Sequence, residues 1–547
     1  MKISEDIFGD IGIDSIGFYA PRNCLNLIDL AKHRNVDPNK YKKGLLLREM
    51  RFPDTGEDIV SMGLKAGYNA LTRGRIDPTS IDAIFIGTET MTYAVKSVSN
   101  ILAQMLGVSV NCMTQDVYNA CAAGTLAILN AIALIEKDVI NKALVISSDI
   151  STYRIGSPGE PTQGAGAAAM VISKNPRIAT FSKKFGKISG NINDFYRLAH
   201  EETPEVFGEY SINSYLTFQL GAYDDLIKSI GDFYADYYTL HSPYSKLTLK
   251  CMQQIILRRW SIELNRLLKI DFRHLVRSVR KKIFNWFKEV RILPEFLYSK
   301  LKEGGLSLPQ IDLVRNWVHD KFKNQIIPQL VVPMHFGNMY SASVWAQIFY
   351  ILENSALRDE VIYFGSYGSG ATCISGLLKV QPEFVQIVNL KPQVIDYFEM
   401  KQRKSVQEYE DLRNKIYQPK FSLGHIIEHE KNDKQGFTLH FCDEGCIIPK
   451  IEGLDYCPKG HSGYHSKFFP LFAILDSDPI KPDSQDIGYL KNDLVRINGT
   501  PEKGNPLEFE VRRVEDNQFD TDQVKGSLNW TPTYIPLNKT TYHYIDF

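Results

Sequence analysis

Cys121 is the residue whose type and position could supply a nucleophile. It lies in the segment NACAAGT, between a stretch with strand character and the apolar run 126–135, which has the character of a buried helix. At a helix N-terminus, unpaired N–H groups and the positive end of the dipole favour a thiolate over a thiol. The small flanking residues would let a bulky substrate reach the sulfur. A small, buried core residue is the alternative interpretation.

Three more side chains could serve acyl transfer beside such a thiol. Glu89 directly follows the apolar strand 81–86, and a carboxylate whose pKa is raised by burial can remove a weakly acidic C–H proton. His241, in HSPYSK, and Asn338, in GNMYSAS, could donate an N–H group to a thioester oxygen as it gains charge. The alternative interpretations are a solvated loop glutamate and a structural histidine beside a proline turn.

Several motifs occur in an order that resembles 3-hydroxy-3-methylglutaryl-CoA synthases, members of the thiolase-like superfamily of condensing enzymes. The resemblance runs from about residue 11 to about residue 417, roughly three quarters of the chain. Five motifs flank the cysteine segment: GTETM at 87–91, EPTQGAGA at 160–167, HSPYSK at 241–246, GNMYSAS at 337–343 and SYGSG at 366–370. Their number and order make the resemblance specific, because any one of them alone would be a weak signal.

The resemblance implies a role for each of these residues. Cys121 would carry an acetyl group, Glu89 would act as general base and acid, and His241 is the third catalytic residue. Lys246 and Lys250 would lie near the phosphates of coenzyme A, as point charges on flexible stems. The implied substrate-binding residues are Asn338, Ser366, Lys246, Lys250, Tyr340 and Thr162.

The implied reaction joins acetyl-CoA to acetoacetyl-CoA. Acetyl-CoA would acetylate Cys121, Glu89 would remove a methyl proton, and the enolate would attack the ketone of acetoacetyl-CoA bound near His241 and Asn338. Water would then release the product. No redox cofactor and no catalytic metal is required. The resemblance further implies a homodimer and a place in isoprenoid synthesis through mevalonate.

Other functions stay open at this point. A related enzyme could use the same residues on carrier-protein thioesters for polyketide branching, and a ketoacyl synthase would lack the Glu89 element. A third hypothesis is a non-catalytic thiolase-like scaffold that docks other proteins. Ala122 and Ala123 depart from the tyrosine and glycine of eukaryotic members, which leaves the substrate pocket open. Lys246, where polyketide-branching relatives often have glycine, favours free CoA substrates.

Strand-like and helix-like segments alternate along the chain and predict a layered α/β fold. The resemblance implies two related halves, 1–175 with Glu89 and Cys121 and 176–420 with His241 and Asn338, layered α-β-α-β-α with the site between them. Predicted strands are 11–19, 81–86, 143–148, 167–173, 330–334 and 361–364, and predicted helices are 58–72, 97–106, 125–137 and 342–352.

Two regions lie outside this pattern. Residues 251–306 have helical character, with 258–291 strongly basic and amphipathic, which fits a solvated face on a packed helix pair or a membrane-surface helix. Residues 421–547 form a predicted β-rich appendage, for which a protein partner is one hypothesis. The appendage contains a zinc-ribbon-like spacing, which either binds a structural zinc or consists of unrelated thiols and a histidine: Cys442, Cys446, Cys457 and His461.

Composition bounds the class of protein. The chain has 547 residues, which is more than one core usually serves, so at least two domains are expected. Lys plus Arg equal Asp plus Glu at 63 each, so no net charge indicates a nucleic-acid partner. No secretory signal and no transmembrane segment are expected. The eight cysteines, five scattered and three clustered between residues 442 and 457, do not have the spacing of a disulfide framework, and they predict a reducing, cytoplasmic location.

Overall fold

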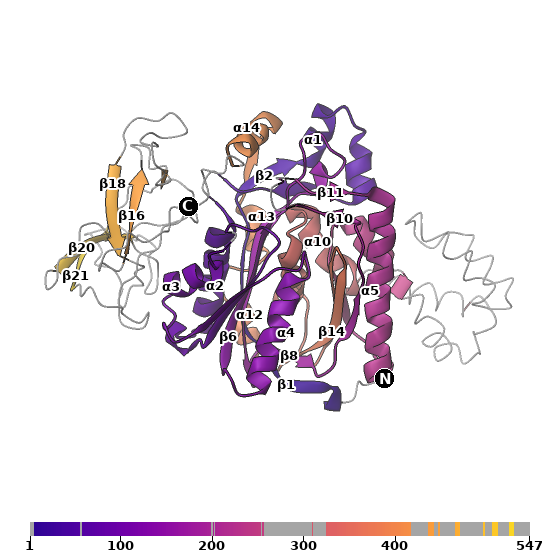
Figure 1. Ribbon diagram of the computed structural model, residues 1–547, viewed down its shortest axis with the longest axis horizontal. Coiled ribbons are helices and arrows are strands. Elements are labelled where there is room, and N and C mark those ends of the chain that lie inside the picture. Colours follow the sequence, from indigo (N-terminus) through magenta and orange to yellow (C-terminus); the bar gives the residue numbers. More distant parts are fainter. Residues whose placement is uncertain are drawn as a thin grey trace.

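The computed structural model of the chain describes two core segments, 5–255 and 324–416, and short strands beyond them (Figure 1). Residues 55–56, 94, 199–200, 202 and 253 within the core are not described, and residue 309 is described on its own. Beyond residue 416 the described ranges are 436–441, 447–448, 465–470, 496–497, 506–511 and 524–529. Two sets of predictions lie outside the described residues: the basic segment 258–291, with most of 251–306, and the cluster Cys442, Cys446, Cys457 and His461.

A mixed sheet of ten strands forms the framework of the core. The strand order is β12-β13-β14-β8-β1-β7-β6-β4-β5, and β9 pairs with β14. Both faces of β4, β6, β7 and β13 are buried, so most of their residues are small or apolar without alternation. The strands are β1 (Phe8–Tyr19), β4 (Ala83–Gly87), β5 (Met113–Val117), β6 (Lys142–Ile150), β7 (Ala165–Lys174), β8 (Ala179–Ser182), β9 (Gly186–Ser189), β12 (Tyr237–Leu240), β13 (Val361–Gly368) and β14 (Thr372–Val380).

Helices lie in three layers around these strands (Figure 1). α2 (Ile59–Gly74) and α3 (Val98–Met105) pack on one face of β4, β6 and β7, and α4 (Ala123–Glu136) packs on the other face. α11 (Ser343–Asn354) shares the central core with α4, and α5 (Gly208–Ile230) covers the outer face of β9, β13 and β14. The predicted layered α/β fold is therefore confirmed.

The two flanks of the sheet repeat one pairing pattern. On one flank β4 is parallel to β6, which is antiparallel to β7, and α4 precedes β6. On the other flank β12 is parallel to β13, which is antiparallel to β14, and α11 precedes β13. This repetition is what two related halves would produce, and the boundary between them at residue 175 stays a prediction.

One predicted element is wrong. Residues 330–334 were expected to form a strand because Leu-Val-Val is an apolar run rich in β-branched residues, but they lie inside helix α10 (Ile327–Phe336). α10 packs against α11 and contributes Val332 and Phe336 to the central core. Burial of this face outweighs the local strand preference of valine. The other predicted strands and helices coincide with observed ones within a few residues at their ends.

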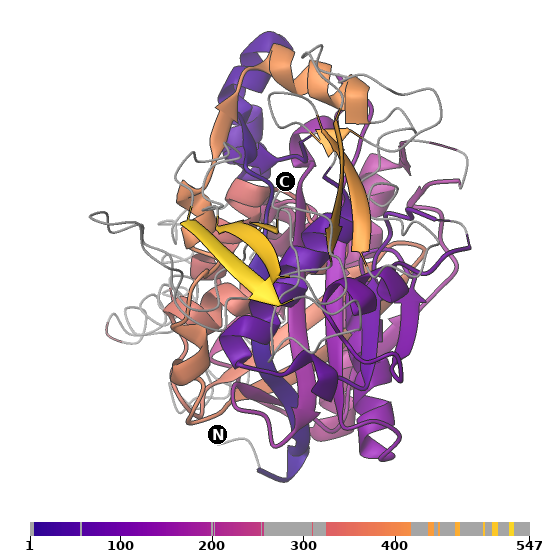
Figure 2. The same ribbon diagram turned by 90° about the vertical axis from the view of Figure 1, so that its left-hand side faces the viewer.

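Smaller elements surround the core. A three-stranded sheet of β2 (Asn23–Asn26), β3 (Glu49–Arg51) and β15 (Gln402–Lys404) joins distant parts of the chain. α1 (Leu27–His33) lies beside α14 (Val406–Ile416), as Figures 1 and 2 show. The remaining elements of the core are the hairpin of β10 (Phe195–Tyr196) and β11 (Glu205–Val206) and the helices α12 (Val385–Val388) and α13 (Asp396–Glu399). Beyond the core, one sheet has β16 (Gly436–Phe441) between β17 (Ile447–Ile448) and β18 (His465–Pro470). A second sheet has β20 (Pro506–Val511) between β19 (Arg496–Ile497) and β21 (Val524–Asn529).

Candidate active site

Cys121 lies where β5 leads into α4. The chain turns through Ala120, whose φ is 45°, and Cys121 stands just before Ala123, the first residue of α4, so its predicted place at a helix N-terminus is confirmed. The turn packs closely on the end of β4, because a Cβ on Gly87 would lie 2.4 Å from the Cα of Gly124. This approach requires glycine at position 87. It brings the loop after β4 next to the sulfur.

Glu89 is the first acid of that loop, and it contacts Cys121. The Cys121 thiol donates a hydrogen bond to the Glu89 carboxyl group. Glu89 is partly exposed as a residue, but its Oε2 atom is buried and has no hydrogen-bond partner among the described residues. Burial, and then the nearby charge of Asp149, raise the pKa of Glu89 to about 8. A carboxyl group with this pKa can both accept and return a proton near neutral pH.

The thiol itself differs from the expectation of a thiolate. Burial of Cys121, and then the Glu89 carboxylate beside it, raise the pKa of the thiol well above its ordinary value. Only 6% of Cys121 is exposed, so the dipole of α4 acts on a sulfur that water barely reaches. Desolvation and the neighbouring negative charge outweigh the helix dipole here. The resting sulfur is therefore a neutral thiol hydrogen-bonded to the Glu89 carboxyl group.

Asp149 holds the loop that carries Glu89. Its carboxylate Oδ1 accepts hydrogen bonds from the Thr88 hydroxyl at 2.7 Å, from the Glu89 amide at 2.8 Å, and from the amide and hydroxyl of Thr90 at 3.0 and 2.8 Å. Its Oδ2 accepts from the amide and hydroxyl of Ser341. The sequence analysis missed Asp149. Since β4 and β6 are parallel neighbours, an acid at the end of β6 could have been placed beside Glu89.

His241 follows β12 and is almost completely buried. Its amide donates to the Gly365 carbonyl at 2.7 Å, and its carbonyl accepts from the Tyr215 hydroxyl at 2.6 Å, so β13 and α5 fix the backbone. Burial lowers the pKa of His241 to about 3, so the ring is neutral. The ring atom Nδ1 is buried and has no hydrogen-bond partner among the described residues. A neutral imidazole in this state can donate one hydrogen bond to a bound substrate.

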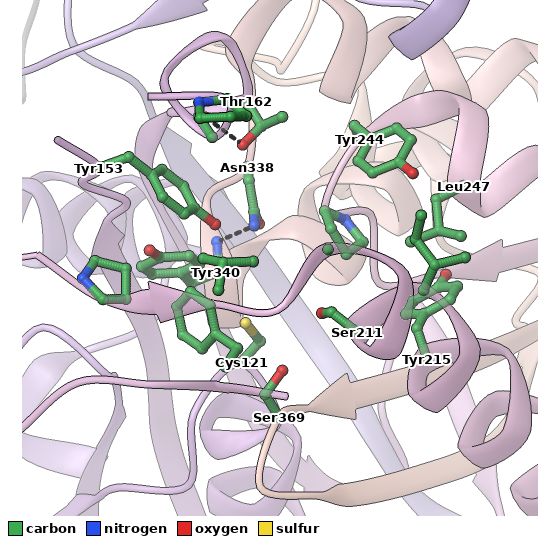
Figure 3. Close-up of a pocket in the computed structure, with 18 of the residues that line it drawn as sticks. Cys121, Tyr153, Thr162, Ser211, Tyr215, Tyr244, Leu247, Asn338, Tyr340 and Ser369 are labelled. Atoms are coloured by element: carbon green, nitrogen blue, oxygen red, sulfur yellow. Dashed lines mark hydrogen bonds between the residues drawn. The ribbon is translucent and has the colours of Figure 1, made fainter. Parts of the chain in front are cut away.

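Asn338 is held in a tight turn after α10. Its amide donates to the Thr162 carbonyl at 3.0 Å. Its side-chain Oδ1 accepts from the Tyr340 amide at 3.0 Å and from the Ser343 hydroxyl at 3.1 Å. The Nδ2 amide group is therefore the side that can donate to a ligand. Figure 3 shows Asn338 directed into the same space as Cys121.

These groups surround one pocket of about 440 Å³ (Figure 3). Cys121, His241, Asn338, Thr162 and Tyr340 line it, and Glu89 touches the sulfur from just outside the lining. The structure thus brings together residues from four distant parts of the sequence around one thiol. A base, a nucleophile and two neutral N–H donors in one buried space are the requirements of acyl transfer.

Comparison with known proteins identifies the family. The sequence profile of the hydroxymethylglutaryl-coenzyme A synthase N-terminal part matches residues 8–177, and that of the C-terminal part matches residues 306–420. Hydroxymethylglutaryl-CoA synthase B of Dictyostelium discoideum is 30% identical over 379 residues, which are 66% of this chain and 76% of the relative. The chain belongs to the hydroxymethylglutaryl-CoA synthase family. It is accordingly an acyl-condensing enzyme, as the motifs predicted.

Further relatives agree with this family. Hydroxymethylglutaryl-CoA synthase of Enterococcus faecalis is 32% identical over 260 residues, or 47% of this chain and 67% of the relative. The solved structure of MvaS in complex with 3-hydroxy-3-methylglutaryl coenzyme A aligns with a TM-score of 0.60 at 26% identity, covering 74% of this chain and 91% of that chain. An HMG-CoA synthase complexed with CoA aligns with a TM-score of 0.58, also at 26% identity, covering 78% and 94%. The thiolase-like fold is therefore confirmed.

Three predicted substrate-binding residues do not line the pocket. Ser366 is completely buried, and its hydroxyl accepts from the Thr125 hydroxyl at 2.8 Å, while Tyr367 and Ser369 of the same motif reach the pocket. Lys246 and Lys250 are partly exposed. Burial, and then the nearby charge of Lys250, lower the pKa of Lys246. Both lysines follow the pocket-lining turn after His241. Their substrate contacts stay predictions.

Two aromatic residues of the site escaped the sequence analysis. Tyr153 lines the pocket and hydrogen-bonds through its hydroxyl to the side chains of Thr162 and Tyr340. Phe195 of the β10–β11 hairpin packs edge-on against Tyr153 and Tyr340, with ring centroids 6.3 and 6.1 Å away. Only the tertiary fold brings these rings together. Their sequence positions carry no motif beyond an aromatic residue in a loop.

Proposed function

We propose that this chain condenses acetyl-CoA with acetoacetyl-CoA to 3-hydroxy-3-methylglutaryl-CoA through an acetyl group carried on Cys121. The observation that supports this most directly is the hydrogen bond from the Cys121 thiol to Glu89, a base whose pKa is about 8, inside a pocket that also holds two neutral donors. Solved relatives hold CoA and 3-hydroxy-3-methylglutaryl coenzyme A. The site needs no redox cofactor and no catalytic metal for these steps.

In the first step the acetyl group moves to sulfur. Glu89 accepts the thiol proton as Cys121 attacks the acetyl carbonyl, and a thioester forms on Cys121 as the bond to the CoA sulfur breaks. Glu89 then returns the proton to the departing CoA thiolate, which leaves as free CoA. Because Glu89 ends this step ionised, the same carboxylate is ready for the second step.

In the second step Glu89 removes a proton from the methyl group of acetyl-Cys121. The enolate carbon attacks the ketone carbon of acetoacetyl-CoA, and Glu89 returns its proton to the new alkoxide. His241 and the Nδ2 group of Asn338 donate hydrogen bonds to the thioester oxygen of acetoacetyl-CoA and keep it in place. Water then hydrolyses the bond to Cys121 and releases the product. Lys246 and Lys250 are proposed to meet the CoA phosphates near the pocket mouth.

The decisive experiment is intact-protein and peptide mass spectrometry after mixing with acetyl-CoA. We expect a mass gain of one acetyl group on Cys121, and its absence in Cys121→Ala. Cys112→Ala is the matched control, because Cys112 is half-buried and lies outside the pocket lining. A wild-type protein without the adduct, or a Cys121→Ala variant that still turns over, would contradict the proposal. Turnover of an acetoacetyl carrier protein but not acetoacetyl-CoA would favour the polyketide-branching alternative.

We also propose that the chain forms a homodimer through the edge of the sheet at β5. The outer side of β5 pairs with no strand among the described residues. Val110, Met113 and Tyr118, in and around this strand, are 90%, 43% and 43% exposed. Pairing with a second copy would satisfy the edge and cover these side chains. Light scattering should give a dimer, and Met113→Lys should weaken it.

A structural zinc in the appendage is a separate proposal. It rests on the spacing of Cys442, Cys446, Cys457 and His461, which lie outside the described residues. Among the described residues there is no cluster that could hold a metal ion. Zinc analysis of the purified protein should give about one equivalent, lost in Cys446→Ser. A protein partner for 421–547 and a cytoplasmic location stay predictions, and none of the described helices combines the length and apolarity needed to cross a bilayer.

A further inference from the structure

One wall of the pocket is a loop between β6 and β7. Six lining residues come from it: Tyr153, Arg154, Ser157, Pro158, Gly159 and Thr162. The loop carries little regular structure, since only the short 3-10 turn Glu160–Thr162 interrupts it. A loop with so little regular structure needs contacts on the side facing away from the pocket to hold its pocket-lining residues in one arrangement.

Helix α14 supplies contacts behind this wall. Arg413 is 7% exposed, and its Nη2 donates to the Tyr153 carbonyl at 2.9 Å. Its Nη1 donates to Oε1 of Gln163, which also accepts from the Tyr153 amide at 2.8 Å. The Gln163 Nε2 group donates to the Tyr409 hydroxyl at 2.7 Å. A buried guanidinium thus holds both ends of the loop, through hydrogen bonds that are strong because the donor is charged.

A second contact from α14 reaches the middle of the loop. Glu160 is almost completely buried and accepts two hydrogen bonds, both at 2.9 Å, from Arg34, the C-cap residue of α1. Arg34 also pairs with Glu410 of α14 at 2.5 Å. The Gly156 amide donates to Glu160 at 2.9 Å. The loop is therefore held by α1 and α14 together, and Figures 1 and 2 show these two helices side by side.

Gln163 also connects these contacts to Asn338, whose side chain is one of the N–H donors of the site. Gln163 and Asn338 form an isolated β-bridge, and the Asn338 amide donates to the Thr162 carbonyl at 3.0 Å. Displacement of Gln163 would therefore displace Asn338. Cys121 and Glu89, by contrast, are placed by β4, α4 and Asp149, with no hydrogen bond from the loop backbone among those described. The two parts of the site have separate supports.

We propose that Arg413 is a positioning residue for the condensation step. Arg413 keeps Tyr153 and, through Gln163, Asn338 in the arrangement that holds acetoacetyl-CoA, while acetyl transfer to Cys121 proceeds without it. This inference rests on the proposed function, because it assigns the two steps to two parts of the same site. Helix α14 lies outside the pocket, near the end of the core segment 324–416, and through Arg413 it affects the binding of acetoacetyl-CoA, the second substrate.

The test separates the two half-reactions in Arg413→Ala. Acetylation of Cys121 by acetyl-CoA, followed by mass spectrometry, should stay within about threefold of wild type, while kcat/KM for acetoacetyl-CoA should fall about 10- to 100-fold, the range expected from a small misplacement of a binding group. Arg403→Ala is the matched control, because Arg403 is an exposed arginine on β15. It should leave both measurements unchanged.

A conservative variant guards against misfolding of Arg413→Ala. Tyr409→Phe keeps the ring in its core cluster and removes only the hydroxyl that accepts from Gln163. It should lower kcat/KM for acetoacetyl-CoA in the same direction but by less, with acetylation intact and only a small decrease in unfolding temperature, because the buried Gln163 Nε2 group loses one acceptor. A parallel loss of both half-reactions in folded Arg413→Ala, or wild-type condensation in it, overturns the inference. Absence of the acetyl adduct in wild type would instead overturn the proposed function.

Discussion

At the sulfur of Cys121, two influences act in opposite directions. The N-terminus of α4 favours the thiolate, while burial and the Glu89 carboxylate raise the pKa of the thiol well above its ordinary value. Burial and the neighbouring carboxylate outweigh the helix dipole, so the resting sulfur is a neutral thiol hydrogen-bonded to the Glu89 carboxyl group. A buried, neutral thiol is protected from oxidation and from unwanted alkylation until an acyl substrate displaces the remaining water.

The pKa of Glu89 gives the first prediction. Burial raises this pKa to about 8, so the base form is populated only as the pH rises through about 8, and about a tenth is ionised at pH 7. We expect kcat/KM to increase with pH and to level off above this value. Glu89→Gln removes the base and should lower kcat by about 10² to 10⁴. The measurement is a pH-rate profile of condensation.

Asp149 offers a control for that assignment. The charge of Asp149 is the second cause of the raised pKa of Glu89, after burial. Asp149→Asn removes the charge, so the rise in kcat/KM should move to lower pH. Asp138 is exposed and lies far in sequence from the loop that carries Glu89, so Asp138→Asn should leave the pH-rate profile unchanged. An unchanged profile in Asp149→Asn would mean that another group controls the rate.

Motifs located the reacting residues, but not those that hold them. Cys121, Glu89, His241 and Asn338 could be found because chemistry restricts each position to a few residue types. Asp149, Tyr153 and Arg413 act through contacts between elements far apart in sequence, such as the bond from Arg413 to the carbonyl of Tyr153. No local pattern records such contacts. They became visible only when the strand order and the place of α14 were known.

At the scale of elements, the contact between the β6–β7 loop and the turn after α10 sets the position of Asn338. Gly164 allows this contact, because a Cβ there would lie 2.4 Å from the Phe336 carbonyl oxygen and 2.7 Å from the Asn338 amide nitrogen. Neither the backbone at Gly164 nor that at 336–338 can move away without breaking the β-bridge between Gln163 and Asn338. Close packing therefore holds the turn in place together with its hydrogen bonds.

This geometry predicts the effect of Gly164→Ala. The added methyl group should push Asn338 away, lowering kcat/KM for acetoacetyl-CoA at least about tenfold and the free energy of unfolding by about 1–3 kcal/mol, the usual cost of overpacking. Gly9→Ala is the matched control, since the nearest atom to its added Cβ lies at an ordinary 3.7 Å. Steady-state kinetics and urea unfolding measure both effects. Equal behaviour of the two variants would refute the steric argument.

Local sequence patterns predicted some elements correctly, and tertiary contacts explain why one prediction failed. Periodicity and turn residues located α2, whose N-terminus carries a capping box between Asp58 and Ser61, and α4 and α11, whose apolar runs are long. The segment 330–334 failed because a short apolar run fits a buried strand and a buried helix equally well. Packing of α10 against α11 decided the outcome, and that packing depends on residues distant in sequence.

At the scale of the whole molecule, buried polar contacts link the two flanks of the sheet. Thr125 of α4 donates to Ser366 of β13 and accepts from the Trp345 indole at 3.2 Å. Arg73 of α2 pairs with Glu353 of α11 at 2.8 Å, with both side chains almost completely buried. The site lies where these flanks meet, so its geometry depends on their relative position. Polar groups buried in this way fix one arrangement, because any other leaves them unpaired.

The pair of Arg73 and Glu353 gives the last prediction. Glu353→Ala leaves a buried guanidinium without its carboxylate and the Val394 amide without its acceptor, so it should lower the free energy of unfolding by about 3–5 kcal/mol. Asp138→Asn, which removes the charge of the exposed pair with Lys174 and keeps a residue type that tolerates the left-handed backbone at this position, should leave the free energy of unfolding nearly unchanged. Urea unfolding measures both. Arg73→Leu combined with Glu353→Leu should recover part of the loss, because no charge is then left unpaired, and a double variant less stable than Glu353→Ala would show that the flanks depend on the ion pair itself.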